Sequence, residues 1–127
     1  MNNYARGLQE YKTQSVNTMT QGEQLLLLYD NMIKRLKKAS ILLDHEDYSN
    51  FEKEVTGCHK IVRYLDGTLD RRYPISRNLN QMYEYFGYQL IRLTAGRDRG
   101  IIDELVPLIS ELRDSFCEAD KLARKAK

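Results

Sequence analysis

Apolar side chains recur at alternating spacings of three and four residues in four stretches of the chain. Residues at these spacings share one side of an α-helix, so each stretch predicts an amphipathic helix with one buried stripe. The near-heptad spacing is typical of helices that pack at a shallow angle. The predicted stripes are Leu25, Tyr29, Met32, Leu36, Ala39 and Leu43; Phe51, Val55, Cys58, Val62, Leu65 and Leu69; Leu79, Tyr83, Phe86, Leu90 and Leu93; and Leu105, Leu108, Leu112, Phe116, Ala119 and Ala123.

Polar residues mark where the first two helices begin and end. Thr20 and Glu23 have the spacing of a capping box, in which each side chain bonds the other residue's backbone N–H. The helix that follows is expected to run to about Asp44. A polar connector comes next, with Asp47 as the N-cap of a second helix over about 48–70.

The last two helices are bounded by proline, serine and glycine. Pro74 cannot lie inside a helix, so the chain is expected to break there, and Ser76 is expected to cap the third helix. Residues 96–100, which begin and end with glycine, close that helix and turn the chain. The last helix is expected over about 101–124, with a kink or a new start at Pro107.

Four such helices joined by short connections predict an all-α fold, an antiparallel up-down four-helix bundle over residues 20–124. Residues 1–18 carry Leu8 and Tyr11 three apart in a polar background, so they are expected to form a docking arm or a short extra helix. The whole chain, 1–127, is of a length that fits a single domain.

Two of the predicted helices carry more apolar residues than a bundle needs. The first is apolar all round from Leu25 to Tyr29, and Ile33, Ile41 and Leu42 lie off its stripe. The third has Met82, Tyr85, Tyr88 and Ile91 beside its stripe. A helix with apolar residues on two sides must be covered on both, by the core on one side and by a second surface on the other. Neighbouring helices or the arm could supply that cover, and so could a protein partner, whose interfaces are enriched in tyrosine.

Composition and charge narrow the function classes. The net charge is only +2, and the basic run Lys34, Arg35, Lys37 and Lys38 is typical of a solvated helix face, so nucleic-acid binding is a distant alternative. Cys58 and Cys117 are expected to be buried, reduced thiols. No secretory leader or membrane-spanning run is present, which predicts a cytoplasmic protein.

The sequence shows no motif for catalysis or for a cofactor. No glycine-rich phosphate loop and no Glu-x-x-His pair occurs. Cys58 and His59 are adjacent on a helix and therefore point in different directions, and His45 falls in a polar connector. We expect no enzymatic activity, no metal and no cofactor, but binding of another polypeptide.

The chain resembles the flagellar secretion chaperone family FliS along nearly its whole length. The arm contributes Leu8 to Tyr11 and Val16, and the first helix contributes the segment from Glu23 to Asp30. Each further motif is short, but their order and spacing agree with the family. These motifs are Leu69-Asp70, Asn78-Leu79 with Met82-Tyr83, Arg92-Leu93 with Ala95, Asp98, and Glu111-Leu112-Arg113 with Phe116.

The resemblance implies a cytoplasmic chaperone that binds the C-terminal segment of flagellin, blocks its premature polymerisation and delivers it to the type III export apparatus. It implies a bundle whose apolar grooves hold the client, with the arm near that surface. The residues carried over from the family are Leu8, Tyr11, Leu25, Leu28 and Tyr29. The apolar excess of the third helix adds Tyr85 and Tyr88 to the expected flagellin-binding residues.

The function and the oligomeric state both stay open at this point. A helical adaptor or regulatory protein could use the same grooves on another protein partner. Contacts with the export apparatus and with regulatory proteins would accompany either function. An exposed groove could also be covered by a second copy of the chain, so both a monomer and a weak dimer are compatible with the sequence.

Overall fold

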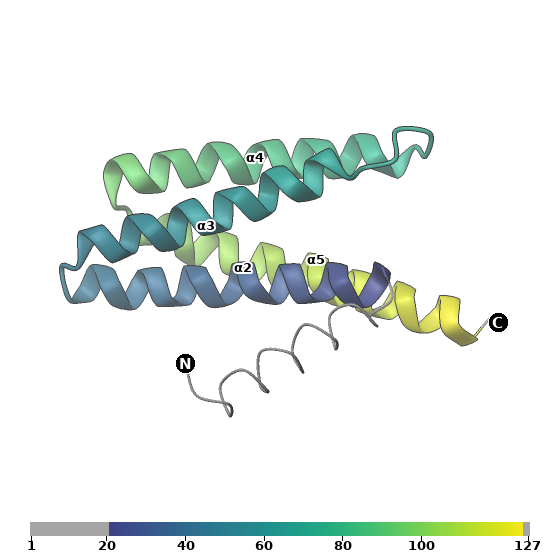
Figure 1. Cartoon of the computed structure of the whole chain (residues 1–127), viewed down its shortest axis with the longest axis horizontal. Coiled ribbons are helices and arrows are strands. Elements are labelled where there is room, and N and C mark those ends of the chain that lie inside the picture. Colours follow the sequence, from purple (N-terminus) through teal and green to yellow (C-terminus); the bar gives the residue numbers. More distant parts are fainter. Residues whose placement is uncertain (1–20, 126–127) are drawn as a thin grey trace, which may run out of the picture.

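The computed structural model describes residues 21–125 as four α-helices that run up and down in turn (Figure 1). They are α2 (Gln21–Asp44), α3 (Tyr48–Gly67), α4 (Ile75–Gly96) and α5 (Arg99–Lys125). Helix α2 packs against α3 and α5, and α3 packs against α4, whereas α4 and α5 touch less. The expected all-α, antiparallel four-helix bundle is confirmed. The expected arm, and the Thr20 half of the capping box, lie outside the described residues.

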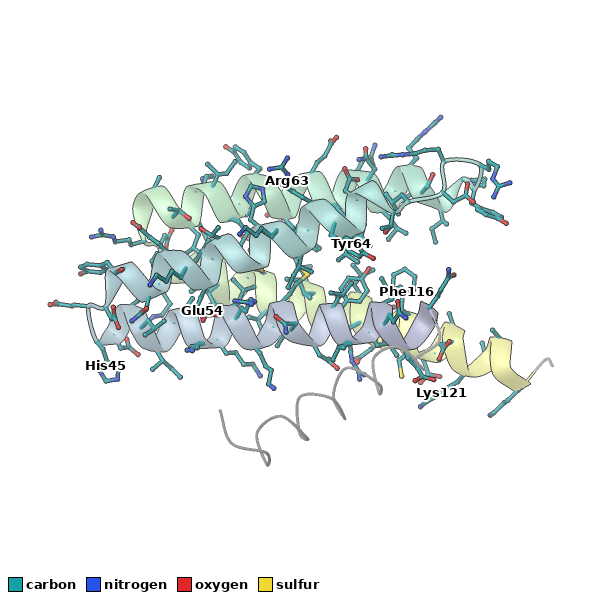
Figure 2. All side chains as sticks on the ribbon, in the orientation of Figure 1. His45, Glu54, Arg63, Tyr64, Phe116 and Lys121 are labelled. Carbon is teal, nitrogen blue, oxygen red and sulfur yellow. The ribbon has the colours of Figure 1, made fainter. Side chains whose placement is uncertain are left out.

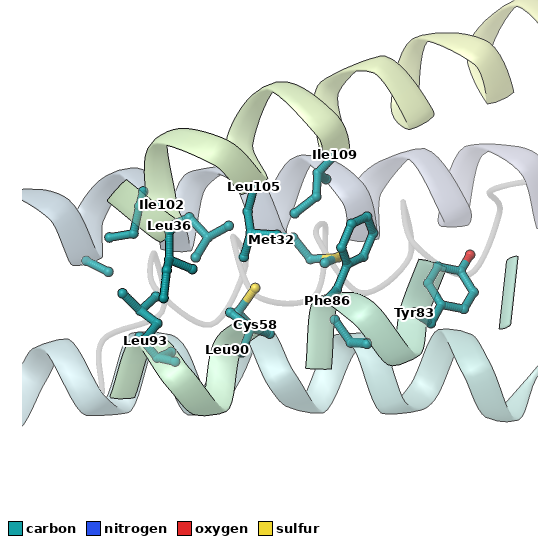
Figure 3. Close-up of a cluster of buried hydrophobic side chains, with 14 of the residues drawn as sticks. Met32, Leu36, Cys58, Tyr83, Phe86, Leu90, Leu93, Ile102, Leu105 and Ile109 are labelled. Atoms are coloured by element: carbon teal, nitrogen blue, oxygen red, sulfur yellow. The ribbon is translucent and has the colours of Figure 1, made fainter. Parts of the chain in front are cut away.

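The predicted stripes of α2, α3 and α4 form the core. Tyr29, Met32, Leu36 and Ala39 are buried on α2, and every stripe residue of α4 is buried. Leu25, Leu43 and Leu69, at the ends of their stripes, are only partly buried. Figure 3 shows the apolar side chains of several helices meeting in the interior. A stripe at helical spacing therefore located three of the four buried faces.

The predicted stripe of the last helix was wrong at both ends. Ile101, Ile102 and Ile109 are buried although the predicted stripe omitted them, whereas Ala119 and Ala123 are exposed. In Figure 1 the C-terminal end of α5 extends past α2 and α3, so none of the helices described between residues 21 and 125 covers it there. An apolar spacing can continue along a helix after the surface that it packs on has ended.

Pro107 neither ends nor restarts the last helix. Helix α5 is continuous from Arg99 to Lys125, and Pro107 lies on its exposed side. Proline has no backbone N–H, so the carbonyl of Asp103 lacks its usual helical donor. Asp103 is exposed, so water can donate a hydrogen bond to its carbonyl in place of the missing N–H.

The connection between α2 and α3 agrees with the prediction. Asp47 is the N-cap of α3, and its carboxylate accepts a hydrogen bond from the backbone N–H of Asn50 at 3.3 Å. Hydrogen bonds from the Asn50 side chain and backbone lower the pKa of Asp47. Glu46 turns the chain with a left-handed backbone, φ 56°.

The connection between α3 and α4 differs from the prediction. Helix α3 ends at Gly67 and not near residue 70. Thr68 is its C-cap, and the Thr68 hydroxyl donates to the carbonyl of Leu65 at 2.9 Å. Ser76 does not cap α4. Pro74 already has helical angles there, and the hydroxyl of Ser76 donates to the carbonyl of Tyr73 at 2.7 Å. Proline suits a helix start because the first turn needs no N–H donor there.

Candidate functional site

The long sides of the bundle carry shallow hollows where neighbouring helices meet. Between α2 and α3, a hollow of about 340 Å³ is lined by Leu27, Leu28, Ile61 and Tyr64, with polar residues at its edge. Leu27 is 42% exposed and Tyr64 is 59% exposed. Figure 2 shows Tyr64 between the ribbons of α3 and α2. This hollow is an apolar surface that the described helices leave uncovered.

A second hollow, of about 240 Å³, lies at one end of the bundle. Leu25 of α2, Leu79 of α4 and Phe116 of α5 line it together with the segment that joins α3 to α4. From that segment Tyr73 is 60% exposed, and Ile75, at the start of α4, is 59% exposed. All four helices and one connection therefore contribute apolar side chains to this end, with Leu65 as the residue from α3.

Tyr29 lies beneath the second hollow and does not reach its surface. Its side chain is 0% exposed, and its hydroxyl oxygen is 2.5 Å from that of Tyr83. Its ring stacks on Phe116 with the ring centres 5.6 Å apart. Burial raises the pKa of Tyr29 and of Tyr83 above the usual value, so both phenols stay protonated. Tyr29 thus supports the hollow by holding Tyr83 and Phe116 in place.

Tyr85 and Tyr88 belong to different hollows, on either side of α4. Tyr85 lines a hollow between α4 and α5 together with Met82 and Leu108. Tyr88 lines a hollow between α3 and α4 together with His59, and is 61% exposed. The two tyrosines are three positions apart on α4, and their hollows lie on either side of the exposed face of that helix.

A polar cluster links α4 to α5 beside Tyr85. The hydroxyl of Tyr85 donates to the carboxylate of Glu104, and the amide of Gln89 donates to the hydroxyl of Tyr85 at 3.1 Å. Arg92 completes the cluster by donating to the side-chain oxygen of Gln89 at 2.8 Å. The bond to Glu104 raises the pKa of Tyr85. Tyr85 is therefore held in one orientation, with its ring along the groove.

The predicted binding residues do not gather on one surface. Leu28 lines the α2–α3 hollow and Leu25 lines the end hollow, while Tyr85 and Tyr88 line two others. Leu8 and Tyr11 lie outside the described residues. A partner that touched all the described positions would have to wrap around the bundle.

Sequence reasoning missed Ile61 and Tyr64. They are three residues apart on α3 and lie off its buried stripe, so they share a second face of that helix. The same test for apolar excess that singled out the first and third helices would have found this pair on the second.

The described residues show no reactive centre. Cys58 is buried as expected, whereas Cys117 is only partly buried. Burial raises the pKa of the Cys58 thiol to about 12, so it stays protonated at neutral pH. Residues 21–125 contain no group of three His, Cys, Asp or Glu side chains that could hold a metal ion. None of the described helices combines the length and the apolar character needed to cross a membrane. The surface features of this part of the chain are apolar hollows.

Comparisons with known proteins agree with this architecture. The flagellar secretion chaperone FliS of Bacillus subtilis (strain 168) is 28% identical over 115 residues, which cover 91% of this chain and 86% of that protein. A crystal structure of a flagellar chaperone from bacteria matches with a TM-score of 0.77 at 18% identity, over 92% of this chain and 97% of the other, and so shares the fold. The family model of the flagellar protein FliS matches residues 3–123. The chain therefore belongs to the FliS family of flagellar proteins.

Proposed function

We propose that this protein is a cytoplasmic export chaperone that binds the C-terminal segment of flagellin. Binding would prevent premature polymerisation and would deliver flagellin to the flagellar type III export apparatus. Membership of the FliS family supports this function, as does the name of the relative from Bacillus subtilis. The observation that carries the proposal is the apolar hollow between α2 and α3, in which Leu27 and Tyr64 are exposed.

The placement of the hollows suits a client that is unfolded before it binds. A disordered segment can wrap a large surface because it has no fold of its own to keep. Such a client typically buries about 1,000–3,000 Å² of surface, and ordering it costs about 2–5 kcal/mol of the interaction free energy. The separate hollows around the bundle would each hold a different part of one client segment.

The expected binding residues take different roles in this proposal. Leu25, Leu28, Tyr85 and Tyr88 would contact flagellin directly, since each lines a hollow. Tyr29 is buried, so it would act by holding the floor of the end hollow. Leu8 and Tyr11 of the arm would contribute next to the bundle surface.

Calorimetry tests the proposal directly. The purified full chain is titrated with the C-terminal segment of flagellin from the same organism. We expect binding, and we expect the double variant Leu27→Ser/Tyr64→Ser to bind about tenfold more weakly, because both side chains are exposed before binding and buried after it.

Leu122→Ser is the matched control. Leu122 is 66% exposed on α5 and lines none of the hollows described above, so its loss removes apolar surface without touching them. This variant is expected to bind like the wild type. If the wild-type protein gave no binding heat with the flagellin segment at micromolar concentrations, the proposed function would be wrong.

A further inference from the structure

The α2–α3 hollow continues along the two helices into a polar section. From Leu28 the outer side of α2 passes through Asn31 to Arg35, and α3 runs alongside from Ile61 back to Gly57 and Glu54. Figure 2 shows Glu54 and Tyr64 along the same line between the two ribbons. Arg35 lies seven positions after Leu28, and seven positions span about 10 Å along a helix. The apolar hollow and these polar residues therefore lie in one line along the contact between α2 and α3, and we call this line the α2–α3 groove.

Gly57 leaves room for the Arg35 guanidinium on the surface of α3. A Cβ atom at residue 57 would lie 2.5 Å from Nη1 of Arg35 and 2.7 Å from its Cζ. The guanidinium is further fixed because Nε donates to Oδ1 of Asn31 at 2.8 Å and Nη1 donates to Oε2 of Glu54 at 3.2 Å. The Arg35 side chain is still 37% exposed, and its Nη2 has no hydrogen bond to any residue that the structure describes.

Positive charge is in excess along this groove. The carboxylate of Glu54 forms ion pairs with two cations, Arg35 at 3.2 Å and Lys38 at 3.4 Å. One carboxylate balances only one of these positive charges, so one is in excess there. Lys60 stands at the edge of the apolar hollow. On α3, Lys53 shares one helix face with Gly57, Lys60 and Tyr64. A partner that lies in this groove would gain from a negative charge.

We propose that the α2–α3 groove binds one amphipathic helical stretch of the client, and that Arg35 in this groove binds an acidic side chain of that stretch. The apolar side chains of that stretch would enter the hollow at Leu27, Leu28 and Tyr64. A carboxylate about two turns away would accept hydrogen bonds from Arg35, whose planar guanidinium can bond both carboxylate oxygens. This inference rests on the proposed function, and it makes Arg35 a specificity-determining residue.

Gly57→Ala provides a test that keeps every charge in place. The new methyl group would push the Arg35 guanidinium aside, which is feasible because that group ends a flexible side chain. Alanine also favours helix more than glycine, so the variant should fold. We expect its affinity for the flagellin segment to fall about threefold to tenfold, and that of Arg35→Ala to fall about tenfold.

Gly67→Ala is the matched control, because it lies on the same helix and a Cβ there would meet nothing within 4 Å. Added salt should weaken wild-type binding more than it weakens binding by Arg35→Ala, since salt screens the charge pair. If wild-type protein binds the segment while both Gly57→Ala and Arg35→Ala bind equally well, this inference is wrong and the proposed function stands. If wild-type protein does not bind, both are wrong.

Discussion

At the scale of single residues, the Tyr29–Tyr83 pair is the most tightly coupled contact in the core. The two hydroxyl oxygens are 2.5 Å apart, and each residue is almost completely buried. One phenol donates and the other accepts, so each meets the other's need for a partner in a place that water does not reach. Because the two residues lie on α2 and α4, the bond fixes these helices relative to each other beneath the end hollow.

Removal of one hydroxyl from this pair should cost more than removal of both. Tyr29→Phe and Tyr83→Phe each leave the remaining phenol buried without its partner, so we expect each to lower the free energy of unfolding by about 1–3 kcal/mol. The double variant should regain much of this loss. Urea unfolding of the three variants checks the double-mutant cycle, and losses that simply add would contradict the coupling.

Glycine at two positions makes room for a side chain from another helix. A Cβ at Gly57 would overlap Arg35, and a Cβ at Gly22 would lie 2.2 Å from a carboxylate oxygen of Asp120. In both cases the neighbour comes from far along the chain. The sequence alone does not predict these contacts, because they depend on how the helices pack.

At the scale of helices, α5 shows that local preference can be overruled. Proline inside a helix removes one hydrogen bond and strains the preceding turn. Helix α5 nevertheless continues through Pro107, because Ile102, Leu105 and Ile109 on its other side are buried in the core. Packing free energy on both sides of the proline holds the helix together, so no new helix starts at Pro107.

Pro107→Ala should therefore stabilise the protein. Alanine restores the N–H donor to the carbonyl of Asp103, and we expect the free energy of unfolding to rise by about 1–3 kcal/mol. Glu111→Ala, at an exposed position of the same helix, is the control and should change stability by less than about 0.5 kcal/mol. A loss of stability in Pro107→Ala would mean that the proline ring's contacts beside α2 outweigh the missing hydrogen bond.

At the scale of the whole molecule, the bundle can serve as a scaffold that keeps its fold when a client binds. The core takes buried side chains from all four helices, and the hollows lie on its outer sides. Filling such hollows needs no core residue to move. A client that binds only the folded bundle stabilises it by mass action.

The flagellin segment should accordingly raise the unfolding temperature. At a free client concentration of about one hundred times Kd, the expected stabilisation is about 2.7 kcal/mol. Thermal unfolding followed by circular dichroism at several client concentrations measures this shift, and Leu27→Ser/Tyr64→Ser should show a smaller one. A fall in unfolding temperature would indicate that the client prefers the unfolded chain.

The four helices, the buried stripes of three of them and most of the helix ends could be predicted from the sequence alone. These features depend on the period of the helix and on local contacts, such as Asp47 with Asn50, which lie within a few residues of one another. The stripes of α2, α3 and α4 could be read for the same reason. The family motifs, which are also local in sequence, pointed to the FliS family that the family model identifies.

Which residues off the stripes stay exposed depends on the packing of the helices against one another. Leu27 and Leu28 are neighbours in the same apolar run, yet Leu27 is 42% exposed and Leu28 is partly buried against the core. Tyr29 belonged to the same predicted site and is completely buried. Exposure depends on what a neighbouring helix covers, and the meeting of Arg35 with Gly57 depends on how α2 and α3 pack. Neither follows from the period of a single helix, because both are set between helices.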